Sequence, residues 1–216
     1  MTYYYNKEKG FFYNAFLFFK LNFVYNSSIL LACIILGSLT NTISKALITG
    51  VILYFWAYFV HVFAHKVPAY INPHKIHHTP SINNKWWGVL IEFLVNIFGS
   101  GGFTLMIINI ILENIYNISL LHNYTLLYTT FLYSTFHMIN YHILKVQTHI
   151  NHHKYEKYNY GPDIMDMLFG TKLNKDEIEN MNHGIINSVI ILAVLLLTYN
   201  TKFDIVKILQ KNLKIR

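Results

Sequence analysis

The sequence predicts an all-α, multi-pass membrane protein with about four transmembrane helices in two hairpins and a histidine-rich cytosolic cap. Hydrophobic residues make up 54% of the 216-residue chain and charged residues only 12%, which is little charge for the surface of a soluble domain. Several apolar stretches are long enough, or nearly long enough, to cross a bilayer. Ten of the twelve histidines gather in four short clusters between these stretches.

The first hairpin is predicted from two apolar stretches near the N-terminus. Residues 11–24 are aromatic but interrupted by polar side chains, so we expect them to lie along the membrane interface. The stretch 27–40 is apolar and short, whereas 44–65 has the roughly 20 residues that a span requires. A turn at 41–44 would join the two stretches and return the chain to the face on which it began.

The second hairpin is predicted beyond the middle of the chain. Residues 88–98 form an apolar segment of half the length of a span, which the breaker Gly99–Gly102 is expected to end. Residues 103–121 and 124–141 would then form the hairpin, with 117–123 at its tip. Because two crossings return the chain to the face that it left, all four histidine clusters are predicted on one side of the membrane.

The sequence allows several placements for the C-terminal part of the chain. The run 185–199 is strongly hydrophobic but short, so a fifth span, a re-entrant segment and an interfacial helix all remain open. The tail 202–216 is basic and amphipathic, which suits anionic headgroups. We expect one integral membrane domain over 1–216. Its parts are the N-terminal interfacial and first apolar segments (1–44), the histidine-rich core (45–171) and the C-terminal helix and tail (172–216).

Charge and cysteine content exclude several classes of protein. The net charge is +7, but the lysines are dispersed near the ends of apolar segments and beside the histidines. This distribution is typical of the cytoplasmic side of a membrane protein, and no nucleic-acid partner is expected. The single Cys33 lies in an apolar run, so neither a disulfide framework nor a cysteine-based zinc site is expected. The N-terminus lacks the pattern of a cleaved signal peptide.

The histidine clusters form a candidate metal site. Residues at i, i+3 and i+4 lie within about 6 Å of each other on one face of a helix, and neutral imidazole binds iron and zinc alike. One such pair is weak evidence, whereas four clusters in a small membrane protein indicate a dimetal centre. Helix starts are expected at Asn72–Pro73 and at Thr148. The candidate ligands are His61, His65, His74, His77, His78, His137, His142, His149, His152 and His153.

Two of these candidates have an irregular spacing. His137 and His142 are five residues apart, which is about 140° around a regular α-helix. Both can face one point only if a π-bulge or a helix end lies between them, so His137 is the stronger candidate. Neither His122, near a predicted loop on the opposite face, nor His183, after the last cluster, is expected to bind metal.

Further motifs follow the last histidine cluster. These are Asn159-Tyr160-Gly161 and a stretch in which Met165-Asp166 precedes Phe169-Gly170-Thr171. Over residues 45–171 the chain resembles the fatty acid hydroxylase/sterol desaturase superfamily, the membrane histidine-box di-iron oxygenases. That family has a similar Asn-Tyr-Gly stretch and a Trp-Asp-x-x-Phe-Gly-Thr signature, in which Met165 here replaces the tryptophan.

The resemblance implies an oxidoreductase that uses dioxygen to hydroxylate or desaturate a fatty acyl, sphingolipid or sterol substrate taken from the bilayer. The cofactor would be two metal ions, iron in function, with zinc as a possible occupant of purified protein. Electrons would come from a separate b-type cytochrome and its reductase, because the chain carries no cytochrome or flavin domain. The expected location is the endoplasmic reticulum membrane if the source is eukaryotic, with the histidines facing the cytosol. The oligomeric state, the carbon attacked and the physiological metal stay open.

One carboxylate and two other functions also stay open. Asp166 is a candidate acceptor for the N–H of a ligand imidazole, or else an ordinary surface or helix-start carboxylate. No catalytic residue is expected beyond the metal ligands, and the glutamate of a His-Glu-x-x-His zinc protease is absent between His61 and His65. A membrane metal-binding or transport protein, and an inactive family member that retains the fold, remain as alternatives. A transporter would place its ligands near the bilayer midplane, whereas these lie at the predicted ends of spans.

Overall fold

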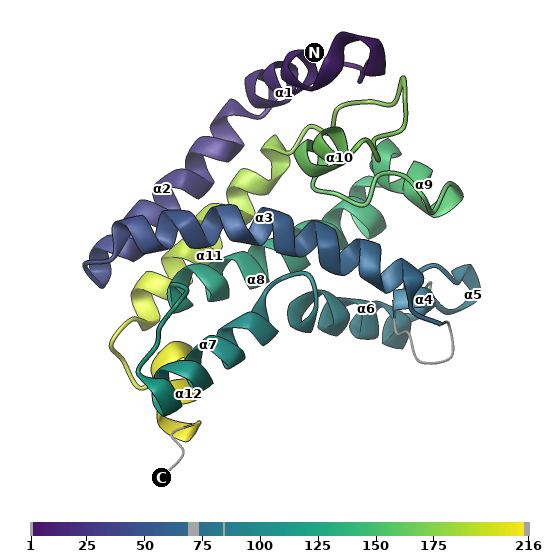
Figure 1. The fold of residues 1–216 in the computed structure, drawn as a ribbon. Helices are drawn as coiled ribbons and strands as arrows, with labels where there is room; N and C mark the ends of the chain where they lie inside the picture. Colours follow the sequence, from purple (N-terminus) through teal and green to yellow (C-terminus); the bar gives the residue numbers. More distant parts are fainter. Residues whose placement is uncertain (1, 69–73, 84, 214–216) are drawn as a thin grey trace.

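The computed structural model describes residues 2–68, 74–83 and 85–213, and within these ranges helices alternate with loops and one isolated bridge joins Tyr4 to Glu177. The apolar stretches form the body of the molecule (Figure 1). The longer helices are α1 (Gly10–Leu21), α2 (Phe23–Leu39), α3 (Ile43–Lys66), α6 (Trp86–Phe98), α7 (Phe103–Tyr116), α8 (Asn123–Met138) and α11 (Ile185–Thr198). The shorter ones are η1 (Lys7–Lys9), α4 (His74–His77), α5 (Pro80–Asn83), the π-helix η3 (Ile139–Leu144), α9 (Gln147–Lys154), α10 (Asp163–Phe169), η4 (Asn182–Gly184) and α12 (Ile205–Asn212).

This architecture confirms an all-α, multi-pass membrane protein, with fewer long spans than the four expected. By length and composition, α3 can cross a membrane, and so can α6 and α7 together over Trp86–Tyr116. A third candidate is α1 with α2, which meet at a bend of 79°. The stretch 99–102 ends α6 at Phe98, as expected, but the chain resumes as α7 and the two helices together make one candidate span. The helices α8 and α11 are shorter, with 16 and 14 residues.

The break between α6 and α7 packs directly against α8. Thr130 Oγ1 donates a hydrogen bond to the carbonyl of Gly101 at 3.0 Å. A Cβ at Gly101 would lie 3.0 Å from the Thr130 carbonyl oxygen and 2.8 Å from that of Asn96, so a side chain there would collide with backbone. The break therefore brings two backbones together where a larger residue has no room.

Helix α8 is the centre of the bundle. Ten of its 16 residues are buried, and it contacts α2, α3, α6, α7 and α11. The main apolar core includes Leu36, Leu53, Met106 and Leu126, which come from four different helices. Several hydroxyls of α8 donate to carbonyls of the same helix, as Ser134 does to the Thr130 carbonyl at 2.8 Å. The helix that carries His137 and leads into η3 is thus packed on several sides by its neighbours.

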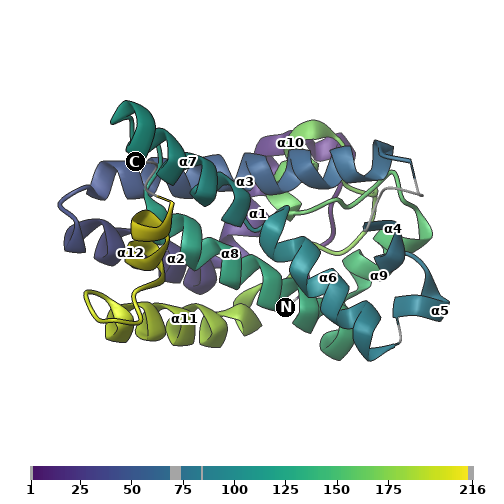
Figure 2. The ribbon, with the colours of Figure 1, turned by 90° about the horizontal axis from the view of Figure 1, so that it is seen from below.

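The two predicted hairpins turn at the same end of the bundle, opposite the histidines (Figure 2). Lys45 Nζ, after the α2–α3 turn, donates to Ser119 Oγ at 2.7 Å in the α7–α8 connection. His122 Nε2 lies 2.9 Å from Thr40 Oγ1, and His122 Nδ1 caps α8 by accepting from the Thr125 N–H at 3.2 Å. His122 is therefore a capping residue far from the other histidines, as expected.

The C-terminal apolar run packs along the bundle as α11, against α2 and α8. Its 14 residues amount to roughly 21 Å of helix, less than the hydrocarbon core of about 30 Å. At its far end the Tyr199 hydroxyl donates to the Leu39 carbonyl at 2.9 Å, beside the α2–α3 turn. The basic tail begins as α12, which is capped by the Asp204 side chain accepting from the Lys207 N–H at 3.2 Å.

Candidate metal centre

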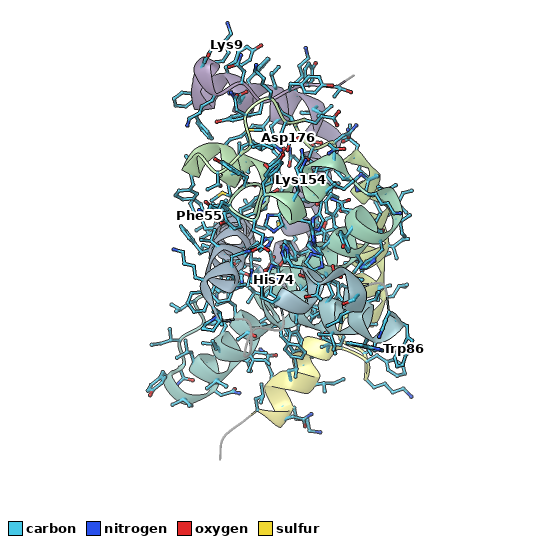
Figure 3. The ribbon with its side chains drawn as sticks, turned by 90° about the vertical axis from the view of Figure 1, so that its right-hand side faces the viewer. Lys9, Phe55, His74, Trp86, Lys154 and Asp176 are labelled. Carbon is cyan, nitrogen blue, oxygen red and sulfur yellow. The ribbon has the colours of Figure 1, made fainter. Side chains whose placement is uncertain are left out.

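The elements at the other end of the bundle supply the predicted ligands. The C-terminal turns of α3, the short α4, the junction of α8 with η3, and α9 all meet there (Figures 1 and 2). Side-chain nitrogens cluster around His74 at the middle of this end (Figure 3). Four segments separated in sequence therefore place their histidines together, as the predicted topology requires.

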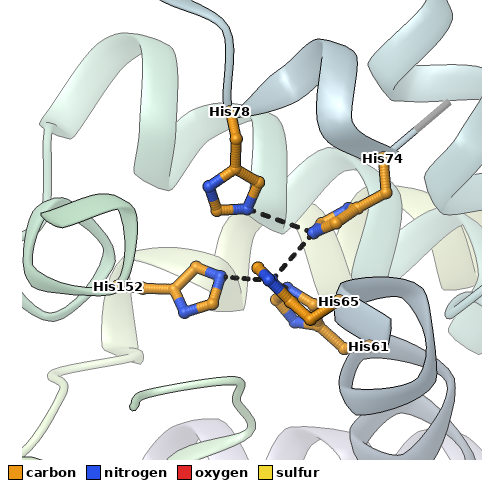
Figure 4. Close-up of side chains that lie close together, drawn as sticks. All are labelled: His61, His65, His74, His78 and His152. Carbon is orange, nitrogen blue, oxygen red and sulfur yellow. Dashed lines mark hydrogen bonds between the residues drawn. The ribbon is translucent and has the colours of Figure 1, made fainter. Parts of the chain in front are cut away.

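The first histidine group consists of His61, His65, His74, His78 and His152, which each offer one ring nitrogen within 4.8 Å of the others. His65 Nε2 lies 3.3 Å from His61 Nε2, 3.0 Å from His152 Nε2 and 3.1 Å from His74 Nε2. The Nε2 atoms of His74 and His78 are 3.1 Å apart (Figure 4). Two neighbouring ligands about 2.1 Å from one cation are roughly 3.0–3.4 Å apart at angles between octahedral and tetrahedral, so this spacing suits a shared metal ion.

Backbone carbonyls select the tautomer of two members of this group. His61 Nδ1 lies 2.5 Å from the Tyr160 carbonyl oxygen, and His152 Nδ1 lies 2.7 Å from that of Tyr158. Because a carbonyl oxygen only accepts, Nδ1 carries the proton in each neutral ring and Nε2 presents a lone pair. Both lone pairs face the interior of the group, which is the arrangement that metal binding needs.

The second histidine group consists of His77, His149 and His153. His153 Nε2 lies 2.8 Å from His77 Nε2 and 3.0 Å from His149 Nε2. The two groups adjoin each other, because the rings of His78 and His153 stack with centroids 4.3 Å apart. Helices α4 and α9 each contribute to both groups, so the predicted triplets divide their histidines between two neighbouring points.

The remaining predicted ligands face a carboxylate. The chain forms the π-helix η3 directly after His137, which confirms the condition under which His137 and His142 can share a face. His137 Nε2 lies 3.1 Å from Glu92 Oε1, and His142 Nε2 lies 2.9 Å from Glu92 Oε2. His77 Nδ1 lies 2.9 Å from Glu92 Oε1 as well, and the His137 ring is 4.7 Å from that of His149. The structure therefore places His137 beside the second histidine group and His142 behind Glu92.

Sequence reasoning missed Glu92, although a signal for it was present. Glu92 is the only charged residue of the apolar helix α6, and it is 3% exposed. An acidic residue inside a membrane segment is costly, so it marks a functional position by default. Its contacts could not be anticipated, because they join α6 to segments on either side of it in the sequence.

Burial keeps the imidazoles of α4 and α9 neutral. Burial, together with the neighbouring imidazoles, lowers the pKa of His74 to about 2, that of His152 to about 3 and that of His153 to about 4. An imidazole in water has a pKa of about 6.5. Near pH 7 these rings therefore keep the lone pairs that a metal ion binds.

Asp166 influences the histidines through a loop and not by direct contact with a ligand imidazole. Its carboxylate is fully buried and accepts hydrogen bonds from the Tyr160 N–H at 2.9 Å, the Gly161 N–H at 2.6 Å and the Thr171 hydroxyl at 2.7 Å. Burial raises the pKa of Asp166 to about 7. Asp166 thus supports the loop whose Tyr160 carbonyl contacts His61, and the backbone, not this carboxylate, meets the imidazole.

One of the two predicted helix starts is wrong, and the other lies outside the described residues. The structure begins α9 at Gln147 with Val146 as N-cap, so Thr148 lies inside the helix and its predicted capping role is wrong. The reason is that the chain reverses at Lys145, which has a left-handed φ of 51°, and the new helix starts at once. The other predicted start, Asn72–Pro73, lies outside the described residues. His183 stays away from both groups, with Nε2 2.6 Å from Asn140 Oδ1.

An apolar cavity of about 140 Å³ leads from the bundle to this end. It lies among α2, α3 and α8, and it reaches the side chains of His61, His137 and His149. Its apolar wall includes Ile29, Leu53, Ala57, Leu132 and Phe136. A hydrocarbon chain lying in this cavity would have one part beside the histidines.

One comparison with known proteins matches this region. A family model described as fatty acid hydroxylase matches residues 46–171. Among curated proteins and among solved structures, nothing matches the chain. The matched range begins in α3 and ends at Thr171, so it contains both histidine groups, Glu92 and Asp166.

Proposed function

The chain belongs to the fatty acid hydroxylase family, and from this premise we propose that it is a membrane lipid oxygenase. Its substrate would be a fatty acyl, sphingolipid or sterol molecule, which it would hydroxylate or desaturate with dioxygen. One observation carries the proposal: eight buried or half-buried imidazoles converge as two adjoining groups where an apolar cavity ends.

The donor set fits two metal ions. The first histidine group would hold one ion and the second histidine group the other, and His137 and His142 would contribute at the second ion through Glu92. Imidazole suits iron and zinc alike, but zinc has no redox chemistry. Iron is therefore the metal proposed for the active protein, and a zinc-loaded preparation is expected to be inactive.

The reaction needs co-reactants that the chain does not carry. Two iron ions at this centre would supply the oxidising chemistry by which dioxygen, two electrons and two protons convert a C–H bond to C–OH and release one water. The electrons would come from a separate donor, a b-type cytochrome with its reductase. This donor would meet the histidine end, where it faces the aqueous phase.

The protein's own contribution is positioning and exclusion of water. Leu53, Ala57 and Leu132 line the cavity and would hold an apolar chain beside His61. The carbonyls of Tyr160 and Tyr158 keep the rings of His61 and His152 oriented. Because the cavity lies between membrane helices, a lipid would enter it from the bilayer without crossing water.

The alternative of a metal transporter is less well supported. Transporters bind their ions near the bilayer midplane, between broken helices. Here His61 and His65 lie in the last two turns of α3, and the other members of the two histidine groups lie on α4, in the turn after it and on α9, outside the candidate spans. An inactive relative is disfavoured because the matched region keeps every predicted histidine.

Lipid analysis tests the proposal directly. Cells that express the chain together with an electron donor should accumulate a hydroxylated or desaturated lipid, and cells that express His153→Ala at the same level should not. Equal lipid profiles in the two strains, with the wild-type protein metal-loaded, would contradict the proposed activity. We also propose that a eukaryotic source would hold this protein in the endoplasmic reticulum membrane, with the histidine end cytosolic.

A further inference from the structure

We propose that Glu92 is a positioning residue of the second metal site, whose carboxylate orients His77 and links it to His137 and His142. This inference rests on the proposed function, because it assumes that the second histidine group holds a metal ion. It assigns a role to the one acidic side chain of α6, and it explains why His137 and His142 both contact this carboxylate.

The position of Glu92 requires a compensating environment. The side chain is 3% exposed and lies in a candidate membrane span. A carboxylate there is expensive unless it is paired and hydrogen bonded. Imidazoles supply the pairing: the nitrogens of His77, His137 and His142 lie 2.9, 3.1 and 2.9 Å from the carboxylate oxygens. No lysine or arginine of the described residues forms an ion pair with it.

His77 connects this carboxylate to the metal site. Its Nε2 atom belongs to the second histidine group, 2.8 Å from His153 Nε2, while its Nδ1 atom lies 2.9 Å from Glu92 Oε1, an ion-pair distance without hydrogen-bond geometry. If Nε2 gives its lone pair to a metal, the proton of the neutral ring must sit on Nδ1. The negative charge of a carboxylate 2.9 Å from Nδ1 favours the proton on that atom, and it would make the ring a stronger ligand.

The π-helix completes the arrangement. The insertion that makes η3 a π-helix turns His142 onto the same carboxylate as His137, despite their five-residue spacing. Glu92 Oε1 is near His77 and His137, and Glu92 Oε2 is near His142. One carboxylate thus joins α4, α6 and the end of α8, which fixes the second histidine group against the bundle.

The two proposed metal sites differ in the charge of the groups that lie behind their histidines. The first histidine group uses the neutral carbonyls of Tyr160 and Tyr158. A carboxylate beside it, Glu156, is half-exposed, lies 3.7 Å from His65 Nδ1 and is paired with Lys75 at 2.6 Å. Among the described residues no lysine forms an ion pair with Glu92. Its charge is therefore not offset in this way, and we expect it to act on the second site. Removal of that charge should therefore weaken one site and spare the other.

The test is zinc binding to the purified, metal-stripped protein in detergent. Glu92→Gln keeps the shape and one acceptor oxygen but removes the charge. We expect one of two zinc sites to weaken by roughly 10–100-fold, as is typical when a carboxylate behind a ligand histidine is lost, and the other to keep its affinity. Glu113→Gln is the matched control, because Glu113 is the other acid of this candidate span and lies near Asn123 and Gln210. It should leave both affinities unchanged.

Three outcomes overturn the inference. These are unchanged affinity at both sites in Glu92→Gln, an equal loss at both sites, and a metal-free variant that unfolds much earlier than wild type, since the last would show a structural role. Glu92→Asp provides a second variant that keeps the charge, and it should restore part of the lost affinity. Failure of the proposed function is distinguishable, because it is measured in the lipid profile of cells with the wild-type protein, whereas this test compares only the metal affinities of purified variants.

Discussion

His74 and His149 each belong to one histidine group only. His74 Nε2 lies 3.1 Å from the Nε2 atoms of His65 and His78, whereas the Nε2 atom of His149 lies 3.0 Å from that of His153. A metal site that loses one imidazole loses much of its affinity, and the neighbouring site keeps its own ligands. The residues therefore predict separable metal sites.

Two single substitutions test this separation. His74→Ala should leave about one metal ion per chain by removing a ligand of the first group, and His149→Ala should do the same at the second. Elemental analysis of the purified variants measures the ratio, and His183→Ala is the control that should keep two ions. Loss of both ions in each single variant would show that the sites are not independent.

At the scale of elements, residue spacing predicted the features that depend on local helical geometry alone. The turn between the first two apolar stretches, the common face of His61 and His65 and the need for a π-bulge before His142 all follow from helical periodicity. Outcomes that depend on tertiary packing were not predictable. The stretch 99–102 ends α6, as local sequence predicts, but α6 and α7 still form one candidate span, and the break between them packs against α8. Glu92 acquires its partners only when three segments meet.

The glycine break gives a prediction of its own. Gly101→Ala places a Cβ 2.8 Å from the Asn96 carbonyl oxygen and 3.0 Å from that of Thr130, and neither backbone atom can move alone. We expect a loss of about 1–3 kcal/mol in unfolding free energy, as for other overpacked sites. Gly50→Ala is the control, because its Cβ would meet only the Cys33 sulfur, at 3.2 Å. Equal thermal unfolding of the two variants in detergent would refute this account of the break.

For the whole molecule, α3 separates the histidine end from the α2–α3 turn. If α3 spans the bilayer, exposed residues at its two ends lie on opposite sides of the membrane. Lys154→Cys in α9 and Asn41→Cys in the turn should then react with a membrane-impermeant thiol reagent from opposite sides of sealed vesicles. The native Cys33 is 3% exposed and provides a low background. Labelling of both positions from the same side would exclude α3 as a span.

The buried histidines also give the whole molecule a pH dependence. Their pKa values in the folded protein are lowered by burial, to about 3 for His152 and about 4 for His153. The unfolded chain binds protons below a pKa of about 6.5, and the folded chain does not until well below it, so stability falls as pH falls. Each such group contributes about 1.4 kcal/mol per pH unit within that window. The metal-free protein should therefore unfold at a lower temperature at pH 5 than at pH 7, and a constant unfolding temperature would contradict neutral burial.

The sequence alone was sufficient for the fold class and for the histidine set, because hydropathy and helical spacing are local properties. It was not sufficient to divide that set. His77 lies in a different group from His74 and His78, its neighbours in sequence, and this separation depends on which segment faces each ring. It was also not sufficient for the role of Asp166, whose donors belong to a loop that the chain forms only after folding.

The central claim is that the histidine end holds two metal ions. Its most direct test is the ratio of bound metal to protein in the full-length chain, purified in detergent and reloaded with iron under anaerobic conditions. The account predicts two ions per chain. A folded, monodisperse chain that takes up none would contradict it.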